Sequence, residues 1–321
     1  MGSDDDTAAP TARVVGAVGA HLVERLRALP GSDLTTLLLE VMRARTDDVT
    51  PATVLHQHRS DRFVVPATVP FERMRAVETA ILDALPDGTE ILALAPLVPL
   101  GTHRAVAPID PRWTVPTIRG TEVAADPTNG LALVAAERRR ELLRSDAATE
   151  VVRLAASQRV VRAQRFPDDA EASFAHFQIV GHVTAGRDPG GRRFECDAVA
   201  DHVRWSARSF LAAGATDIRL GVTDLSDGKA TAVLETARTA ADELGIDVVE
   251  EPERERGRRY YRTCCFQMYA RLGDRSESIA DGGFVDWAAA LTASRKERLC
   301  ISGIGLERLT LASTVAAGRA R

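Results

Sequence analysis

Residues 300–309 read CISGIGLERL, an apolar stretch that runs through two glycines into a charged segment. The apolar residues predict a strand, and Glu307 and Arg308 predict the first turn of a helix that follows it. Gly303 and Gly305 let backbone approach a ligand closely, because glycine has no Cβ. The arginine adds a planar, permanently charged group that suits a phosphate. The stretch therefore predicts either a phosphate site or an ordinary tight turn with a surface arginine.

The composition is that of a soluble globular protein. The chain has 321 residues, of which 45% are hydrophobic and 27% are charged, and its formal net charge is −4. The length allows one large domain or two ordinary ones. The lack of a basic excess argues against a general nucleic-acid-binding surface. No apolar run reaches about 18 residues and the N-terminus has no signal-peptide pattern, so we expect no membrane segment and a cytoplasmic protein.

Cysteine and histidine spacing predicts no metal site. The four cysteines form no C-x-x-C pair, which also argues against a disulfide framework: Cys196, Cys264, Cys265 and Cys300. Buried free thiols are the expectation in a reducing compartment. His56 and His58 are interpreted as residues of a solvated loop.

The N-terminal fifth of the chain predicts a separate helical piece. Residues 1–12 predict disorder, and residues 14–29 and 33–45 place apolar side chains at helical spacing. Residues 13–65 are therefore expected to form a small helical extension, and residues 66–321 the main domain.

The main domain predicts an α+β fold. Its long strand candidates follow one another without helical crossovers, which favours a mostly antiparallel sheet with helices packed on one side. A strand broken by Pro96 and Pro99 is expected over residues 90–100. Further strands are expected over residues 119–125, 160–165, 174–185, 216–221, 247–250 and 258–271, and helices over residues 130–143, 198–213 and 230–244.

Residues 160–186 predict two strands joined by a polar loop. Arg162 lies within the first strand, where a charged side chain is costly unless it has a partner or a ligand. Gln164 lies two residues on and therefore on the same face. Phe177, in the second strand, offers an aromatic platform for a base. The alternative is a hairpin with outward-facing polar residues.

Two further stretches carry candidate chemistry. Residues 254–268, RERGRRYYRTCCFQM, lead a run of arginines into Tyr260 and Tyr261. Concentrated positive charge suits a substrate that develops negative charge, although a solvated face is the alternative. Between a strand and a helix, Asp126 and Thr128 predict either a helix cap or a site for an ammonium group.

In this order, the stretches resemble the catalytic core of class II aminoacyl-tRNA synthetases, most closely the histidyl type and its paralogues, over about residues 66–321. The first motif is similar at Pro96, the second at Arg162 and Gln164 through Phe177, and the third at Gly303 through Arg308. The histidyl-specific stretch is similar at Arg256 through Tyr260, Tyr261 and Gln267. Two shorter similarities are the Asp126–Thr128 stretch and the pair Gly282 and Gly283.

The resemblance implies an ATP site, with Mg²⁺ accompanying the nucleotide. Arg162 and Arg308 would hold the α- and γ-phosphates, Phe177 would stack on adenine, and Gln164 would read its amino group.

The resemblance also implies an amino-acid site. Asp126 and Thr128 would bind an α-ammonium, and Tyr260 and Tyr261 would line the substrate pocket. Arg256 would stabilise charge on the carboxylate and the α-phosphate during adenylation, so Arg162, Arg256 and Arg308 are the expected catalytic residues.

The sequence also departs from the family pattern. The loop over residues 167–173 is acidic, Val183 stands where the family has the glutamate that reads imidazole, and Arg258 and Arg259 replace a Leu-Asp pair. The chain stops soon after Leu309, so we expect no anticodon-binding domain. Histidine as the substrate and ordinary tRNA charging are both disfavoured.

Two functions follow from the resemblance. The first is an ATP-dependent ligase that adenylates an amino acid or related carboxylate and transfers the acyl group to a non-standard acceptor: an amine, a thiol or a tRNA end. The second is a catalytically inactive paralogue that binds an amino acid or regulates a partner enzyme, like the regulatory subunit of ATP phosphoribosyltransferase. A homodimer is expected in either case, because class II cores pair through their first motif.

Overall fold

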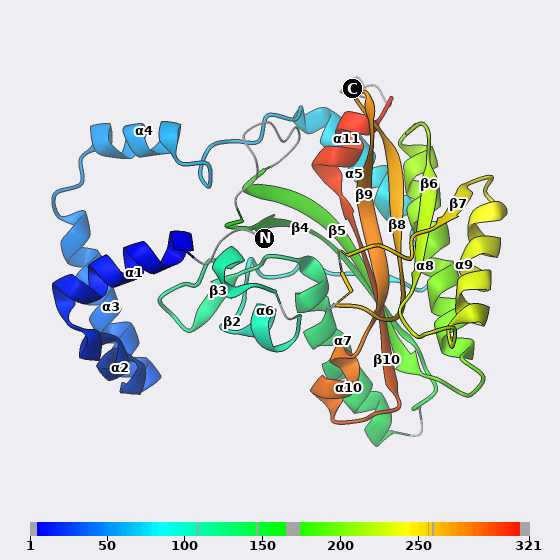
Figure 1. The fold of residues 1–321 in the computed structure, drawn as a ribbon, viewed down its shortest axis with the longest axis horizontal. Helices are drawn as coiled ribbons and strands as arrows, with labels where there is room; N and C mark the ends of the chain where they lie inside the picture. Colours follow the sequence, from blue (N-terminus) through cyan, green and yellow to red (C-terminus); the bar gives the residue numbers. More distant parts are fainter. Residues whose placement is uncertain are drawn as a thin grey trace. The chain divides into compact units, whose positions relative to one another are not determined.

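The computed structural model describes residues 5–107, 109–145, 147–164, 174–255, 257–258 and 260–314. The chain divides into two compact units. The N-terminal unit comprises Met1–Ser60 with Pro116–Thr121, and the core unit comprises Asp61–Val115 with Glu122–Arg321. Figure 1 shows both units, with labels on most of their helices and strands. None of the described helices is both long and apolar enough to cross a membrane.

The N-terminal unit is helical, as its apolar spacing predicts. The helix expected over residues 14–29 is divided at Gly19, whose φ of 86° lies in the region that favours glycine. Residues 5–12 are helical where the sequence suggests disorder, and the alanines of this stretch favour that state. None of the side chains of α2, α3 or α4 is buried. The helices are α1 (Asp5–Val18), α2 (Ala20–Ala28), α3 (Gly31–Thr46) and α4 (Pro51–Ser60).

Among the described residues, eight strands of the core unit form one sheet in the order β1-β4-β5-β10-β9-β8-β6-β7 (Figure 1). Neighbouring strands are antiparallel from β4 to β6, and only the outermost pairs, β1 with β4 and β6 with β7, are parallel. The predicted mostly antiparallel sheet is confirmed. Its strands are β1 (Glu90–Ile91), β4 (Val152–Val161), β5 (His176–Arg187), β6 (Arg219–Asp224), β7 (Asp247–Glu250), β8 (Arg262–Leu272), β9 (Arg275–Val285) and β10 (Glu297–Gly305).

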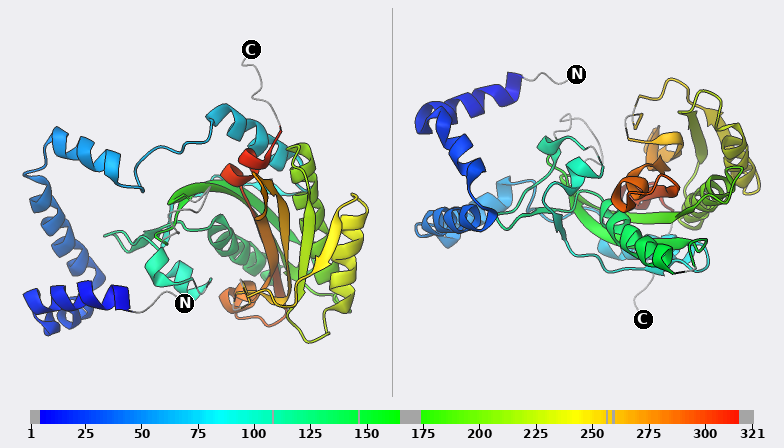
Figure 2. Two further views of the ribbon diagram at one scale, coloured as in Figure 1. Left: turned by 45° about the horizontal axis from the view of Figure 1, so that its top comes forward. Right: turned by 90° about the horizontal axis from the view of Figure 1, so that it is seen from below.

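Helices cover both faces of the sheet, so the expectation that they pack on one side is wrong (Figures 1 and 2). Alternate residues of β10 enter different cores: Cys300 and Ile304 pack with one set of helices, and Leu299 and Ile301 with the other. The first set is α5 (Phe71–Asp83), α8 (Arg193–Ala212), α9 (Thr231–Asp242) and α11 (Leu306–Ala312), and the second is α7 (Pro127–Arg144) and α10 (Trp287–Thr292).

Proline divides the long strand expected over residues 90–100. Pro96 cannot donate to a strand ladder, and β1 ends before it at Ile91. The segment after it pairs in a separate two-stranded sheet. This small sheet and its neighbours are β2 (Leu97–Pro99), α6 (Thr102–Ala105), the short 3₁₀ helix η1 (Pro111–Trp113) and β3 (Thr121–Val123).

A buried ion pair joins α7 to β10. Arg139 and Glu297 are both fully buried, and the Nε of Arg139 lies 2.7 Å from a carboxylate oxygen of Glu297. Arg139 also donates to the carbonyls of Ala148, at 2.8 Å, and Glu150. Because the guanidinium is satisfied on every side, it fixes the second half of α7 against the sheet.

We expect Glu297→Gln to lower the free energy of unfolding by about 3–5 kcal/mol, because it leaves the Arg139 charge buried without its counterion. Denaturant unfolding measures this loss. The control is Glu90→Gln, which removes the partner of the neighbouring, more exposed Arg138 and should cost much less. Equal losses in the two variants would contradict the prediction.

Two histidines stack between the sheet and α8. The rings of His182 and His202 lie 4.1 Å apart between centroids. His202 bonds Thr184 at 2.9 Å and Ser302 at 2.6 Å, whereas neither ring nitrogen of His182 has a hydrogen-bond partner among the described residues. Burial, reinforced by the positive charge of Arg153, lowers the pKa of His182 to about 3. Both rings are therefore held neutral.

Acidification should destabilise the core through these rings. The unfolded chain binds a proton near pH 6.5, whereas folded His182 does so only near pH 3, so stability falls as pH drops between those values. The slope is at most about 1.4 kcal/mol per pH unit for each histidine. We expect His182→Phe to reduce the slope between pH 7 and 5 in denaturant titrations, and His58→Phe, at an exposed position, to preserve it. An unchanged slope in His182→Phe would refute this account.

Candidate functional site

The start of α7 rests directly on β5. A Cβ placed on Gly181 would lie 2.8 Å from Cγ of Pro127 and 3.3 Å from Cγ2 of Thr128, so only glycine permits this approach. Asp126 is the N-cap residue of α7, as the sequence predicts. Its Oδ1 accepts from the Thr128 amide at 2.9 Å and from the Thr128 hydroxyl at 2.7 Å. The helix start therefore holds a carboxylate and a hydroxyl just above the sheet.

Arg162 fixes the other oxygen of this carboxylate. It follows β4 rather than lying within it, and its Nη2 donates to Oδ2 of Asp126 at 3.0 Å. Its Nε donates to the carbonyl of Ala125 at 2.8 Å. The guanidinium also lies over the ring of Phe177, 5.1 Å from the centroid. The predicted phosphate-binding arginine is thus paired with the predicted ammonium-binding carboxylate.

A second carboxylate lies across the sheet from the first. Asp281 of β9 is opposite Gly303 of β10, which in turn is opposite Gly181 of β5. Residues paired across strands point to the same face, so Asp281 faces the same side as the start of α7. Two strand spacings, about 10 Å, separate the backbone at Gly181 from that at Asp281. The floor between them is the bare backbone of Gly303.

The environment of Asp281 disfavours its charged form. Desolvation by surrounding protein raises the pKa of this carboxyl, and the negative charge of Asp126 adds to the effect. Arg254 opposes both effects; its Nη2 lies 3.4 Å from Oδ2 of Asp281. Even so, 49% of the Asp281 side chain is exposed. The carboxylate is therefore close to other protein groups but remains half exposed. It lies on the sheet face that carries the start of α7, which we call the site face.

Two tyrosines complete this group. The rings of Tyr260 and Tyr261 meet edge to face at 4.9 Å between centroids, and Tyr260 meets Trp287 of α10 in the same way at 5.0 Å. Desolvation first, and then the charges of Asp126 and Asp281, raise the pKa of Tyr260 well above its usual value. Tyr260 therefore remains a neutral hydroxyl beside both carboxylates.

Three further predicted residues are Arg308, Gln164 and Arg256. Arg308, in α11, donates from Nη1 to the carbonyl of Ser278 at 3.3 Å, three residues before Asp281 on β9. The carbonyl of Gln164 accepts from Arg62 at 2.9 Å. Arg256 falls outside the described residues. The structure thus brings together Asp126, Thr128, Arg162, Phe177, Tyr260 and Tyr261, and adds Asp281 and Arg254, whose roles sequence reasoning missed.

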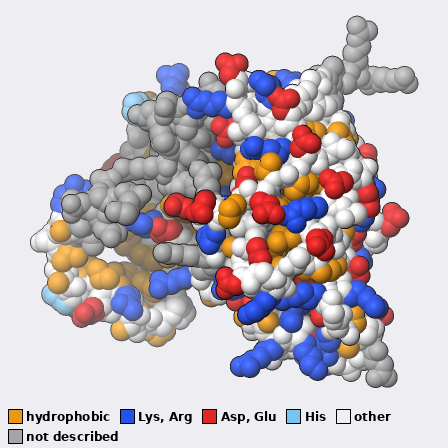
Figure 3. All heavy atoms as spheres, turned by 45° about the vertical axis from the view of Figure 1, so that its right-hand side comes forward, with side chains coloured by type: hydrophobic (Ala, Val, Ile, Leu, Met, Phe, Trp, Pro, Cys, Tyr) orange, Lys and Arg blue, Asp and Glu red, His pale blue; other side chains and the backbone are white. Residues whose placement is uncertain are grey.

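An acidic hollow adjoins Asp281. It has a volume of about 650 Å³ and shares Arg254 with the ion pair of Asp281. It also includes Gln267, the residue opposite Asp281 on β8. Its charged lining consists of Arg254 and five glutamates: Glu250, Glu251, Glu253, Glu255 and Glu277. Figure 3 brings forward the side of the core unit with β7 and α9, where acidic side chains are spread among basic and apolar ones.

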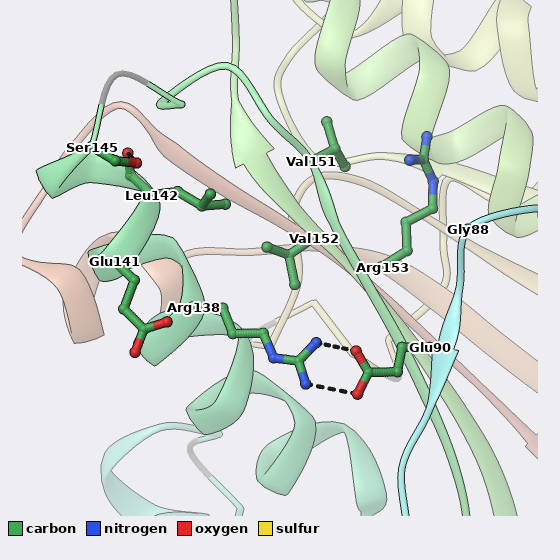
Figure 4. A pocket seen from close by; sticks show the side chains of 9 residues that line it. All are labelled: Gly88, Glu90, Arg138, Glu141, Leu142, Ser145, Val151, Val152 and Arg153. Carbon is green, nitrogen blue, oxygen red and sulfur yellow. Dashed lines mark hydrogen bonds and ion pairs between the residues drawn. The ribbon is translucent and has the colours of Figure 1, made fainter.

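A second hollow, of about 580 Å³, lies at the β1 edge of the sheet (Figure 4). Arg138 and Glu90 form a two-pronged ion pair in it, with one contact of 2.9 Å, so its central charge is already neutralised. Arg138 lies about 18 Å along α7 from Asp126. We therefore place the candidate site at the start of α7. Among the described residues, no group of three or more His, Cys, Asp or Glu side chains could hold a metal ion.

Solved structures share this fold. An ATP phosphoribosyltransferase regulatory subunit/histidyl-tRNA synthetase from Bacillus halodurans matches with a TM-score of 0.60 and 13% identity over 78% of this chain and 82% of that chain. Apo histidyl-tRNA synthetase from S. aureus matches with a TM-score of 0.58 and 15% identity over 77% and 69%. A histidine–tRNA ligase subunit from Alicyclobacillus acidocaldarius matches with a TM-score of 0.56 and 18% identity over 77% and 95%.

The chain therefore has the class II aminoacyl-tRNA synthetase-like fold, as the sequence predicts. No model of a protein family matches the sequence. No curated protein matches it either.

We expect Gly181→Ala to lower the free energy of unfolding by about 1–3 kcal/mol, because its methyl group would overlap Pro127 at the start of α7. The control is Gly303→Ala on the adjacent strand, whose Cβ would meet Cγ2 of Ile179 at 3.2 Å and no other described atom within 4 Å. Denaturant unfolding of both variants measures the difference. If Gly303→Ala costs as much as Gly181→Ala, the close approach of α7 does not set the cost.

Proposed function

We propose that this protein binds an amino acid, or a related compound with an ammonium and a carboxylate, at the start of α7, and activates the carboxylate with ATP. The observation that carries the proposal is the Asp126–Arg162 ion pair, held over β5 by the cap of α7. An amino-acid zwitterion can insert into such a pair. Its ammonium would take Asp126 and its carboxylate would take Arg162, so that two ion pairs replace one.

Fixed geometry favours this exchange. The Asp126 carboxylate is already oriented by the two donors of Thr128, which lowers the entropy cost of binding an ammonium. Tyr260 lies beside it as a neutral, electron-rich ring, and such rings attract cations. Asp126, Thr128 and Tyr260 would thus form the ammonium side of the site.

In the activation step, a carboxylate oxygen of the ligand would attack the α-phosphorus of ATP. A new P–O bond forms, the bond from that phosphorus to the bridging oxygen breaks, and pyrophosphate leaves. Arg162, Arg256 and Arg308 would supply positive charge to the reacting groups, together with Mg²⁺ bound to the nucleotide. Phe177 and Gln164 would receive the adenine. The acceptor of the acyl group would be an amine, a thiol or a tRNA end.

A homodimer is part of the proposal. The β1 edge of the sheet and the adjacent β2 segment expose three large apolar side chains, Ile91, Leu97 and Leu100, with 53%, 41% and 56% of their surfaces accessible. A second copy would cover them. This edge contains Pro96, the residue that resembles the first-motif proline.

A second candidate is an amino-acid-binding regulator without catalysis. Two observations favour it. Arg162 lies over the Phe177 ring, where adenine would stack, and the charged lining of the hollow beside Asp281 is five glutamates against one arginine, which repels a polyphosphate. ATP would therefore have to displace Arg162 and bring Mg²⁺ to compensate the acidic lining.

Isothermal titration calorimetry with a panel of amino acids, with and without Mg·ATP, tests the proposal. We expect one class of amino acid to bind, and Asp126→Asn to weaken it by about 10- to 100-fold, because asparagine keeps the helix cap but removes the charge. The control is Asp110→Asn, whose carboxylate also caps a helix and pairs with an arginine, Arg112. The affinity of Asp110→Asn for the amino acid should match that of the parent protein.

Pyrophosphate exchange then separates the two candidates. An amino-acid-dependent exchange that is lost in Arg162→Gln supports the ligase. Amino-acid binding without exchange supports the regulator. The absence of binding by any member of the panel contradicts both.

A further inference from the structure

The Asp281 carboxylate retains capacity to accept hydrogen bonds on the site face. An ionised carboxylate offers about four lone-pair positions. Arg254 takes one of them at 3.4 Å, a long contact, and Tyr261 lies near enough to favour the charged form. Almost half of the side chain remains exposed. The carboxylate can therefore accept another donor without losing these partners.

A ligand anchored at Asp126 can reach Asp281 along the sheet. Gly303 lies between Gly181, beneath the start of α7, and Asp281. Among the described residues, a Cβ on Gly303 would meet Cγ2 of Ile179 at 3.2 Å and no other atom within 4 Å, so beyond Ile179 these residues leave the backbone there uncovered. A bare backbone lets an extended side chain lie flat across the strand.

The charges along this path favour a cation at its far end. Asp126 is neutralised by Arg162, whereas Asp281 borders the hollow in which five glutamates accompany Arg254. A lining with one sign of charge in excess attracts the opposite charge and disfavours an acidic group.

We propose that Asp281 determines ligand specificity by binding a second cationic group, so that the ligand is an amino acid with a basic side chain. The proposal rests on the function proposed above, because Asp126 must hold the α-ammonium. Asp281 then accepts hydrogen bonds from the side-chain ammonium or guanidinium, which lies over Gly303 and points toward the acidic hollow.

The test compares basic amino acids with neutral ones of matched shape by isothermal titration calorimetry on the full chain. The pairs are lysine with norleucine and arginine with citrulline, with ornithine as a shorter probe. We expect the parent protein to prefer at least one basic member by about 10- to 100-fold. Asp281→Asn should abolish that preference and leave the affinity for the neutral members within about threefold, because the size and the contact with Tyr261 are kept.

The control variant is Asp217→Asn, which removes an exposed ion pair with Arg271 elsewhere in the core unit and should keep the preference. Equal loss of basic and neutral ligands in Asp281→Asn would mean that Asp281 only positions Arg254 and Tyr261, and would overturn the proposal. A parent that binds neutral amino acids without preference for basic ones would also overturn it, while leaving the proposed function intact. Failure of every amino acid to bind would overturn both.

Discussion

The close approach of α7 to β5 is the constraint on which the site depends. The helix can begin directly on the sheet only because Gly181 has no side chain to meet Pro127. Its far half is held by the buried pair of Arg139 and Glu297. An 18-residue helix fixed at both ends places its cap residue, Asp126, with little freedom. Since the partner of that cap, Arg162, directly follows β4, the ion pair joins helix and sheet at the surface where a ligand would lie.

The same ion pair explains why one geometry is compatible with two functions. A zwitterion exchanges one ion pair for two, so the binding of an amino acid needs little rearrangement. A nucleotide requires more, because the guanidinium of Arg162 already covers the Phe177 ring. The difference between a ligase and a regulator is therefore the free energy needed to release Arg162 from that ring and from Asp126. In the proposed function, an ammonium bound at Asp126 would lower this cost, since it would replace the arginine as the partner of the carboxylate.

The sequence could predict those features that depend on local pattern. The antiparallel sheet, the cap at Asp126 and the pairing of Arg162 with some partner all follow from neighbouring residues. β9 was not predicted, because Gly282, Gly283 and several polar residues weaken its strand pattern. Without β9 there is no register, and it is the register that brings Asp281 opposite Gly303. The break at Pro96 within residues 90–100, by contrast, is a local feature that the sequence predicts, because proline cannot donate to a strand ladder. The register between distant strands is not encoded in any single segment. No local pattern therefore predicts that Asp281 lies near the site.

Several features of the site work against stability, and they occur together. Glycine in a strand costs about 0.5–1 kcal/mol relative to alanine, and Gly181 and Gly303 are neighbours on adjacent strands. Asp281 is a carboxyl whose pKa is raised by desolvation and by a second carboxylate, so its charge destabilises the fold unless a cation compensates it. Gly181 has a packing reason, whereas beyond Ile179 the described residues leave Gly303 uncovered and half of the Asp281 side chain exposed. Features that lower the stability of the fold without a compensating contact inside the chain are expected at ligand-binding sites. A cationic group of a ligand would lie over the backbone of Gly303 and pair with the Asp281 carboxylate.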